Sequence, residues 1–80
     1  MTTRPYEQGA YDLSQAVEST RRLGIPRDQV LNHYLGAEGH GIQGALNAAC
    51  NTYGNDAPAD IKASYVLGWV AALLHQKLNP

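Results

Sequence analysis

A glycine-rich hexapeptide at residues 39–44, G-H-G-I-Q-G, matches the G-x-G-x-x-G pattern of dinucleotide-binding loops. That fold requires a strand before the glycines and a βαβ unit around them, whereas a helical pattern precedes them here. Glycines at the start of a helix still leave backbone N–H groups that can hold a phosphate or a carboxylate. The alternative is that they form only a tight turn and a close helix contact. The residues of the hypothetical anion- or nucleotide-binding site are Gly39, His40, Gly41, Arg21, Arg22 and Arg27.

Other residue types that bind metals or catalyse reactions are scattered along the chain. The histidines at positions 33, 40 and 75 lack the i, i+4 spacing of a helical zinc site, and Cys50 has no second cysteine to join it. Cys50 also borders the apolar stripe of its own segment, which predicts a small core residue. The sequence shows no paired carboxylates and no Ser/His/Asp arrangement at a useful spacing. We therefore expect no metal, no cofactor and no enzymatic activity.

The size and charge of the chain restrict its class. It has 80 residues, which predicts one helical domain spanning 1–80, and its formal net charge is −1. This charge gives no general attraction to nucleic acid or to an anionic membrane. The uncharged run between Lys62 and His75 is 12 residues long, against about 20 for a membrane span. With a single cysteine and no secretory signal in the first residues, we expect a cytoplasmic protein without membrane contact.

Apolar spacing, glycine and proline divide the chain into four helices, at about 5–23, 26–35, 40–53 and 57–78. Gly24 is expected to end the first helix in a left-handed cap. A capping-box pattern at Asp12 leaves the alternative that this helix begins near Leu13. Asp56 is the predicted N-cap of the last helix. The fold class is all-α, a compact four-helix domain with roughly antiparallel neighbours.

The last helix carries two different faces. One is a broad arc of large aliphatic residues, which we expect to point inward: Val66, Leu67, Val70, Leu73, Leu74 and Leu78. The other is a strip of small residues that lets a neighbouring backbone come close. We therefore predict a C-terminal helix buried on nearly all sides, with its small-residue groove occupied by a helix of a second copy. The predicted interface residues are Ser64, Tyr65, Gly68, Trp69, Ala72 and His75, with Tyr65 and Trp69 as the main contacts.

Residues 22–35, RLGIPRDQVLNHYL, resemble a helix-turn-helix, with a helix, a glycine turn, an apolar residue and a second helix. The resemblance implies a DNA-binding regulator whose second helix presents Arg27, Gln29, Asn32 and His33. Three interior positions of the motif are polar here, and the chain lacks a basic surface to release counterions from DNA. Nucleic-acid binding is therefore an alternative that we do not favour.

Residues 23–49 also resemble the ubiquitin-associated domain, a three-helix module that opens with a Met-Gly-Phe/Tyr loop. The resemblance is one of packing pattern, and it implies no function because the loop aromatic is missing. The matching residues are Leu23, Gly24, Ile25, Val30, Leu31, Ala45 and Leu46.

Three functional hypotheses follow. The first is a non-enzymatic interaction protein that binds a protein partner and itself, as a homodimer or a higher oligomer. Small, cysteine-poor helical proteins without a catalytic set are frequent among phage-encoded inhibitors, and this class-level analogy suggests an inhibitor role. The second is a sequestering protein for a small anionic ligand or nucleotide. The third is the DNA-binding regulator.

Overall fold

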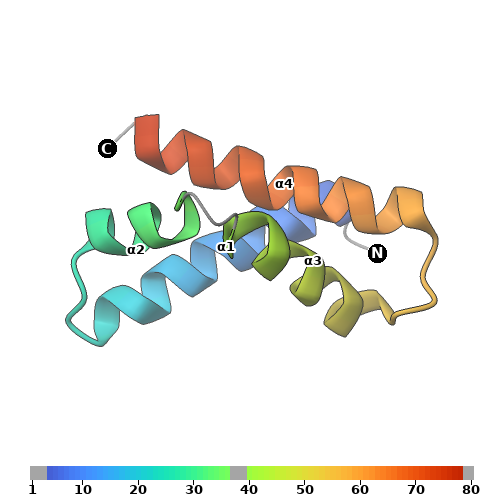
Figure 1. The fold of residues 1–80 in the computed structure, drawn as a ribbon, viewed down its shortest axis with the longest axis horizontal. Coiled ribbons are helices and arrows are strands. Elements are labelled where there is room, and N and C mark those ends of the chain that lie inside the picture. The colour runs from blue at the N-terminus through green and yellow to red at the C-terminus, as the bar shows by residue number, and fades with distance from the viewer. Residues whose placement is uncertain (1–3, 37–39, 79–80) are drawn as a thin grey trace.

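The computed structural model describes residues 4–36 and 40–78, and these form four α-helices (Figure 1). The first two are α1, Pro5–Arg22, and α2, Arg27–Tyr34. The others are α3, His40–Tyr53, and α4, Ala59–Leu78. No strand occurs within the described ranges. The predicted all-α, four-helix fold is confirmed, and the helix bounds agree with the sequence prediction to within two residues.

The ends of α1 follow from local chemistry. Pro5 occupies its first turn, where a missing N–H costs nothing, and Arg4 before it is extended with φ −63° and ψ 143°. After the last turn, Gly24 adopts the left-handed conformation at φ 91°, as the sequence predicts. The helix runs unbroken through Asp12. The alternative start near Leu13 is therefore wrong, and the Asp12 side chain is free for another role.

The start of α4 differs from the prediction. The carbonyl of Pro58 accepts hydrogen bonds from the N–H groups of Ile61 and Lys62, both at 3.2 Å, so Pro58 is the residue at which the helix begins. Asp56 lies two residues earlier, in the turn that follows Gly54. The N-cap assignment of Asp56 is wrong, because the turn continues to Pro58 before the first helical hydrogen bond forms.

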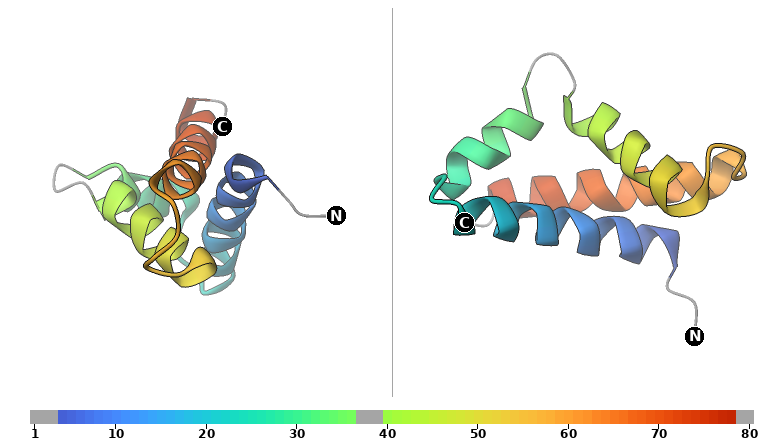
Figure 2. Two further views of the ribbon diagram at one scale, coloured as in Figure 1. Left: turned by 90° about the vertical axis from the view of Figure 1, so that its right-hand side faces the viewer. Right: turned by 90° about the horizontal axis from the view of Figure 1, so that it is seen from below.

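The helices are arranged as two long rods covered by a shorter pair. α1 and α4 lie side by side and run in the same direction, while α2 and α3 return across them in succession (Figures 1 and 2). α2 and α3 meet at an open angle, so the expectation of antiparallel neighbours holds for α1 with α2 and for α3 with α4 but not for α2 with α3. In this arrangement α4 contacts all three other helices.

The core is small and lies where α4 meets the other helices. Its largest fully buried side chains are Tyr65, Leu13, Leu31 and Leu73. Among the described residues, α3 contributes only alanines to the hydrophobic core, Ala45 and Ala49. The core residues are Leu13, Val17, Val30, Leu31, Ala45, Ala49, Tyr65, Trp69 and Leu73.

α4 is not buried on nearly all sides. Leu67, Leu74 and Leu78 of its aliphatic arc are 62%, 45% and 75% exposed, and of that arc only Leu73 is fully covered. The reason is that the other helices cover only part of the circumference of α4, and the covered part includes its small-residue face. No helix in the described part of the chain is long and apolar enough to cross a membrane.

Candidate functional site

The small-residue groove of α4 is occupied by a helix of the same chain. A Cβ atom built on Gly68 would lie 1.9 Å from the carbonyl oxygen of Tyr6, and one built on Gly9 would lie 2.0 Å from that of Tyr65. Backbone therefore meets backbone where α1 and α4 cross, and only glycine fits on either side. The groove is filled as its residues suggest, but its occupant is α1 of the same chain, where the sequence had suggested a second copy.

The predicted interface residues divide into two groups. Tyr65 and Trp69 are 0% and 6% exposed, so they belong to the core of the single chain and offer no surface to a partner. Their assignment as the main contacts is corrected for that reason. Ser64 and Ala72 are half-buried, and His75 is exposed. Beyond the glycine crossing the groove opens into a shallow hollow of about 420 Å³, lined in part by Ala72 and His75.

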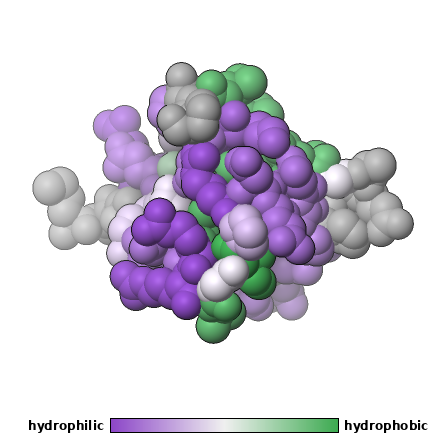
Figure 3. Space-filling view, turned by 90° about the vertical axis from the view of Figure 1, so that its left-hand side faces the viewer, coloured by the Kyte–Doolittle hydropathy of each residue, from purple (hydrophilic) through white to green (hydrophobic). Residues whose placement is uncertain are grey.

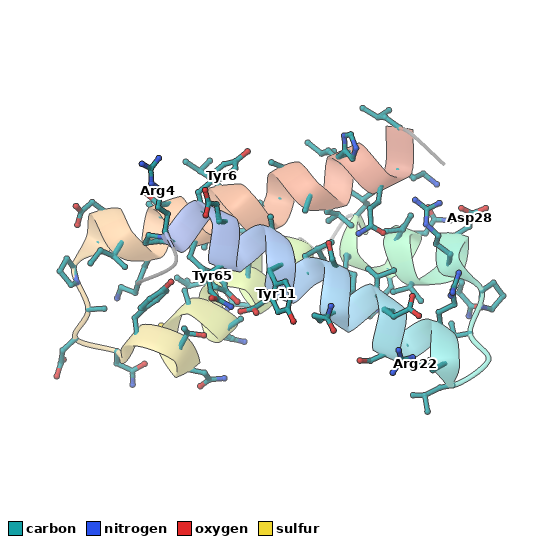
Figure 4. All side chains as sticks on the ribbon, turned by 180° about the vertical axis from the view of Figure 1, so that it is seen from behind. Arg4, Tyr6, Tyr11, Arg22, Asp28 and Tyr65 are labelled. Carbon is teal, nitrogen blue, oxygen red and sulfur yellow. The ribbon has the colours of Figure 1, made fainter. Side chains whose placement is uncertain are left out.

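Tyr65 belongs to a polar cluster that the sequence does not reveal. Its hydroxyl donates a hydrogen bond to the carboxylate of Asp12, and the Gln8 amide donates to the same carboxylate at 2.8 Å. Figure 4 shows Tyr65 between α4 and α3, with α1 passing in front. Burial, and then the hydrogen bond to Asp12, raise the pKa of Tyr65 above its ordinary value of 10.0. Burial and the charge of Asp12 also raise the pKa of Tyr53.

Trp69 packs its indole in the same region without a polar partner. Its ring lies edge-on to Tyr34, with centroids 6.0 Å apart and planes at 88°, and 6.3 Å from Tyr65. Its Nε1 is buried and has no hydrogen-bond acceptor among the residues that the structure describes. The aromatic residues of α4 therefore act in packing. Within this packed region, the hydrogen bond from Tyr65 to Asp12 joins α4 to α1.

The arginines of the hypothetical anion site have other partners. Arg21 and Arg22 lie 3.5 Å and 3.6 Å from a carboxylate oxygen of Glu18, and their side chains are 60% and 78% exposed. Figure 4 places Arg22 at the far end of α1. Arg27 donates to the backbone carbonyl of Gln76 in the last turns of α4. These contacts direct the three guanidinium groups to α1 and α4 rather than to the start of α3.

The glycines of the hexapeptide have different roles. Gly39 lies outside the described residues, and of His40 only its place at the start of α3 is described. A Cβ atom on Gly41 would lie 2.3 Å from the carbonyl oxygen of Tyr34, so Gly41 permits a close contact between α2 and α3. Gly44 has no neighbour within 4 Å of such an atom. The close-contact alternative therefore accounts for Gly41, and ligand binding stays a prediction.

The most unusual surface of the molecule lies over α3 and α4. Ile42 and Leu46 of α3 and Leu67 of α4 are 61%, 40% and 62% exposed, and they line a hollow of about 430 Å³ between the two helices. Leu74 and Leu78 follow Leu67 at helical spacing on the same side of α4. We call this region the α3–α4 apolar surface, formed chiefly by Ile42, Leu46, Val66, Leu67, Leu74 and Leu78.

A second hollow extends this surface toward α2. It has a volume of about 150 Å³ and is lined by Leu35, Ile42 and Val70, among others. Ile42 lines both hollows, so Leu35, which directly follows α2, and the half-buried Val70 of α4 adjoin the α3–α4 apolar surface. Figure 3 views the α2 end of the molecule, which is mostly hydrophilic, with hydrophobic surface at its upper edge over the C-terminal part of α4 and a second hydrophobic area near its lower centre.

This surface is also poor in charge. α3 contains no Asp, Glu, Lys or Arg, and its exposed polar side chains include the amides of Gln43, Asn47 and Asn51. Gln43 donates to Asn47 at 3.0 Å. Lys62 is the charged residue that lines the larger hollow, and its ammonium group donates to the carbonyl of Asn55 at 3.1 Å. Depletion of charge beside exposed aliphatic residues is typical of the centre of a protein interface.

The uncharged sequence of α3 is the signal that sequence reasoning missed. A helix of 14 residues with no charged side chain, in a small protein, is poorly suited to face water on its own. Comparisons with protein-family models, with curated proteins and with solved structures give no match to this chain. The chemistry of the surface is therefore the basis for the functional argument.

Proposed function

We propose that the protein is a non-enzymatic binding protein that docks another macromolecule on the α3–α4 apolar surface. The observation that supports the proposal is the grouping of exposed aliphatic residues from two helices, Ile42, Leu46 and Leu67, around one charge-poor hollow. Single exposed aliphatic residues are normal on soluble proteins, whereas adjoining ones indicate an interaction site. An inhibitor that sequesters another protein would use a surface of this kind.

Several side chains of the surface must be buried together to offset the free-energy cost of association. Full burial of a large aliphatic side chain contributes about 1.5–3 kcal/mol, so completing the burial of a residue such as Leu67 contributes roughly half of that. Association costs about 4–15 kcal/mol in lost freedom of motion. One exposed leucine cannot offset this cost, but the group that includes Ile42, Leu46 and Leu67 can. The expected partner therefore presents a complementary apolar face to both helices.

Photo-crosslinking in the cells that produce the protein tests the proposal. A benzoylphenylalanine placed at position 67 should form an adduct of discrete mass, because this side chain lies in the docking surface. The matched control is the same residue at position 23, since Leu23 is 81% exposed but lies at the α1–α2 turn, away from the surface. Absence of an adduct at position 67, or equal adducts at both positions, contradicts the proposal.

A further inference from the structure

We infer that the occupant of the α3–α4 apolar surface is a second copy of this chain, related to the first by a two-fold axis. This inference rests on the proposed function and names its partner. It places the contact on a face of the molecule different from the small-residue groove, which α1 already fills. The surface chemistry, the available area and the position of Lys62, the charged residue that lines the larger hollow, support it.

The surface chemistry is compatible with itself. A two-fold axis places a patch against an identical patch, so charged groups near the axis meet groups of the same sign. Aliphatic side chains create no such conflict. Amides create none either, because each amide both donates and accepts hydrogen bonds. α3 offers only these two kinds of outward side chain at its centre, with Leu46 beside Gln43 and Asn47.

The amide and the aliphatic side chains of α3 form two separate rows along the helix. Gln43, Asn47 and Asn51 follow one another at four-residue spacing, and Ile42 and Leu46 form a parallel row on the side toward α4. A second copy can thus pack its aliphatic row against the apolar hollow while the amide rows meet at the edge. Lys62 lies near the α3–α4 turn, where Asn55 holds its ammonium group, so the centre of the surface stays free of charge.

The available area sets the strength of the dimer. α3 and α4 have 14 and 20 residues, so together they present roughly 500 Å² when each helix is taken as about 10 Å wide with a rise of 1.5 Å per residue. Stable interfaces bury about 600–1,000 Å² on each partner. The surface is below the lower limit of that range, in the region typical of weak or transient interfaces. We therefore expect a weak dimer that is populated only in the upper part of the micromolar range.

Sedimentation velocity of the purified chain from about 1 to 500 µM tests the inference. The wild-type protein should shift from monomer to dimer over this range. Leu67→Gln and Ile42→Gln, one on each helix, should each weaken dimerisation at least tenfold. Leu23→Gln, at the other end of the molecule, should leave it unchanged. Because all three side chains are more than half exposed, circular dichroism should show the same helical fold in every variant.

Several outcomes overturn the inference. A wild-type chain that stays monomeric at 500 µM rules out the second copy at the strength stated here. A dimer that survives both Leu67→Gln and Ile42→Gln, or that Leu23→Gln weakens equally, rules out this surface. If the chain is monomeric but the crosslink at position 67 yields an adduct of another mass, the proposed function stands and only the second copy is wrong. If neither dimer nor adduct appears, both proposals fail.

Discussion

The two faces of α4 differ in how they are packed: one is in close contact with α1, and the other is exposed. At Gly68 the helix touches the backbone of α1 so closely that a single added methyl group has no room. At Leu67, the preceding residue, the side chain is 62% exposed and borders an open apolar hollow. One face is closed within the chain, and the other is open at the surface.

The difference shows that close approach at small residues, together with the packing of Tyr65, Trp69 and Leu73, determines which face of α4 is buried in so small a domain. Small residues allow helices to approach at backbone distance, and α1 and α3 both contact α4 through glycine or alanine positions. Once these contacts form, no further helix is present among the described residues to cover the leucines on the other side. Leu67, Leu74 and Leu78 therefore stay at the surface.

The largest expected effect comes from the closed face. Gly68→Ala should destabilise the protein by about 3 kcal/mol or more, because the new methyl group forces α1 away from α4. Gly9→Ala should act in the same way from the other helix. Urea denaturation followed by circular dichroism measures both. A change within about 0.5 kcal/mol in either variant would show that the crossing is looser than the structure describes.

Loss of the hydrogen bond between Tyr65 and Asp12, which joins α4 to α1, should have the next largest effect. Tyr65→Phe removes the hydrogen bond to Asp12 and should cost about 1–2 kcal/mol, since a bond to a half-exposed carboxylate is partly screened. A double-mutant cycle with Asp12→Asn isolates the pair. Independent, additive effects of the two substitutions would contradict the bond.

The same tyrosine predicts a dependence of stability on pH. The pKa of Tyr65 is higher in the folded chain than its ordinary value of 10.0. Its contribution is therefore fully present below pH 10, and it is lost as the pH rises above 10 because only the unfolded chain then releases the proton. The free energy of unfolding should therefore fall as the pH is raised above about 10 in the wild-type protein, and less steeply in Tyr65→Phe. Equal slopes would contradict this assignment.

A glycine away from both faces gives a smaller effect of opposite sign. Gly44→Ala lies inside α3 and has open space around the new methyl group. It should stabilise the protein by about 0.5–1 kcal/mol, because alanine loses less backbone freedom on folding. The urea measurement applied to Gly68→Ala compares the two substitutions directly. Destabilisation by Gly44→Ala would mean that this position packs against something beyond the single chain.

The open face should give the smallest effect on the isolated chain. Leu67→Gln should change the free energy of unfolding by no more than about 0.5 kcal/mol at low micromolar concentration, because the side chain has little to lose. At high concentration the wild-type melting temperature should rise with protein concentration, whereas that of the variant should not. Thermal melts at two concentrations measure this. A large loss at low concentration would show that Leu67 supports the core.

The helices and their ends could be predicted from the sequence because they depend on neighbours along the chain. Gly24 and Pro5 mark helix ends by their own backbone preferences. The assignment of Asp12 and Asp56 to caps fails for a related reason. The same short polar side chain that caps a helix can also sit within one and bond to a distant tyrosine, as Asp12 does.

The functional surface could be predicted only in part. The sequence shows that α4 has two faces, but which face is covered depends on how many helices are present and how closely each can approach. The burial of Trp69 and the exposure of Leu67 follow from that arrangement. The anion-site hypothesis likewise needed the arginines to fold toward Gly41, and their actual partners, such as Gln76 for Arg27, depend on tertiary packing.

The glycine crossing also affects how the chain reaches its native state. Gly9 and Gly68 are 59 positions apart. The close crossing of α1 and α4 therefore joins residues with a large sequence separation, which raises the contact order of the fold. Bringing the two ends of such a loop together costs about 4 kcal/mol in chain entropy before any contact repays it. Leu13 and Val17 on α1 have no complete cover until α4 arrives. Folding should therefore be all-or-none, with no stable intermediate on the ribosome before the last helix has emerged.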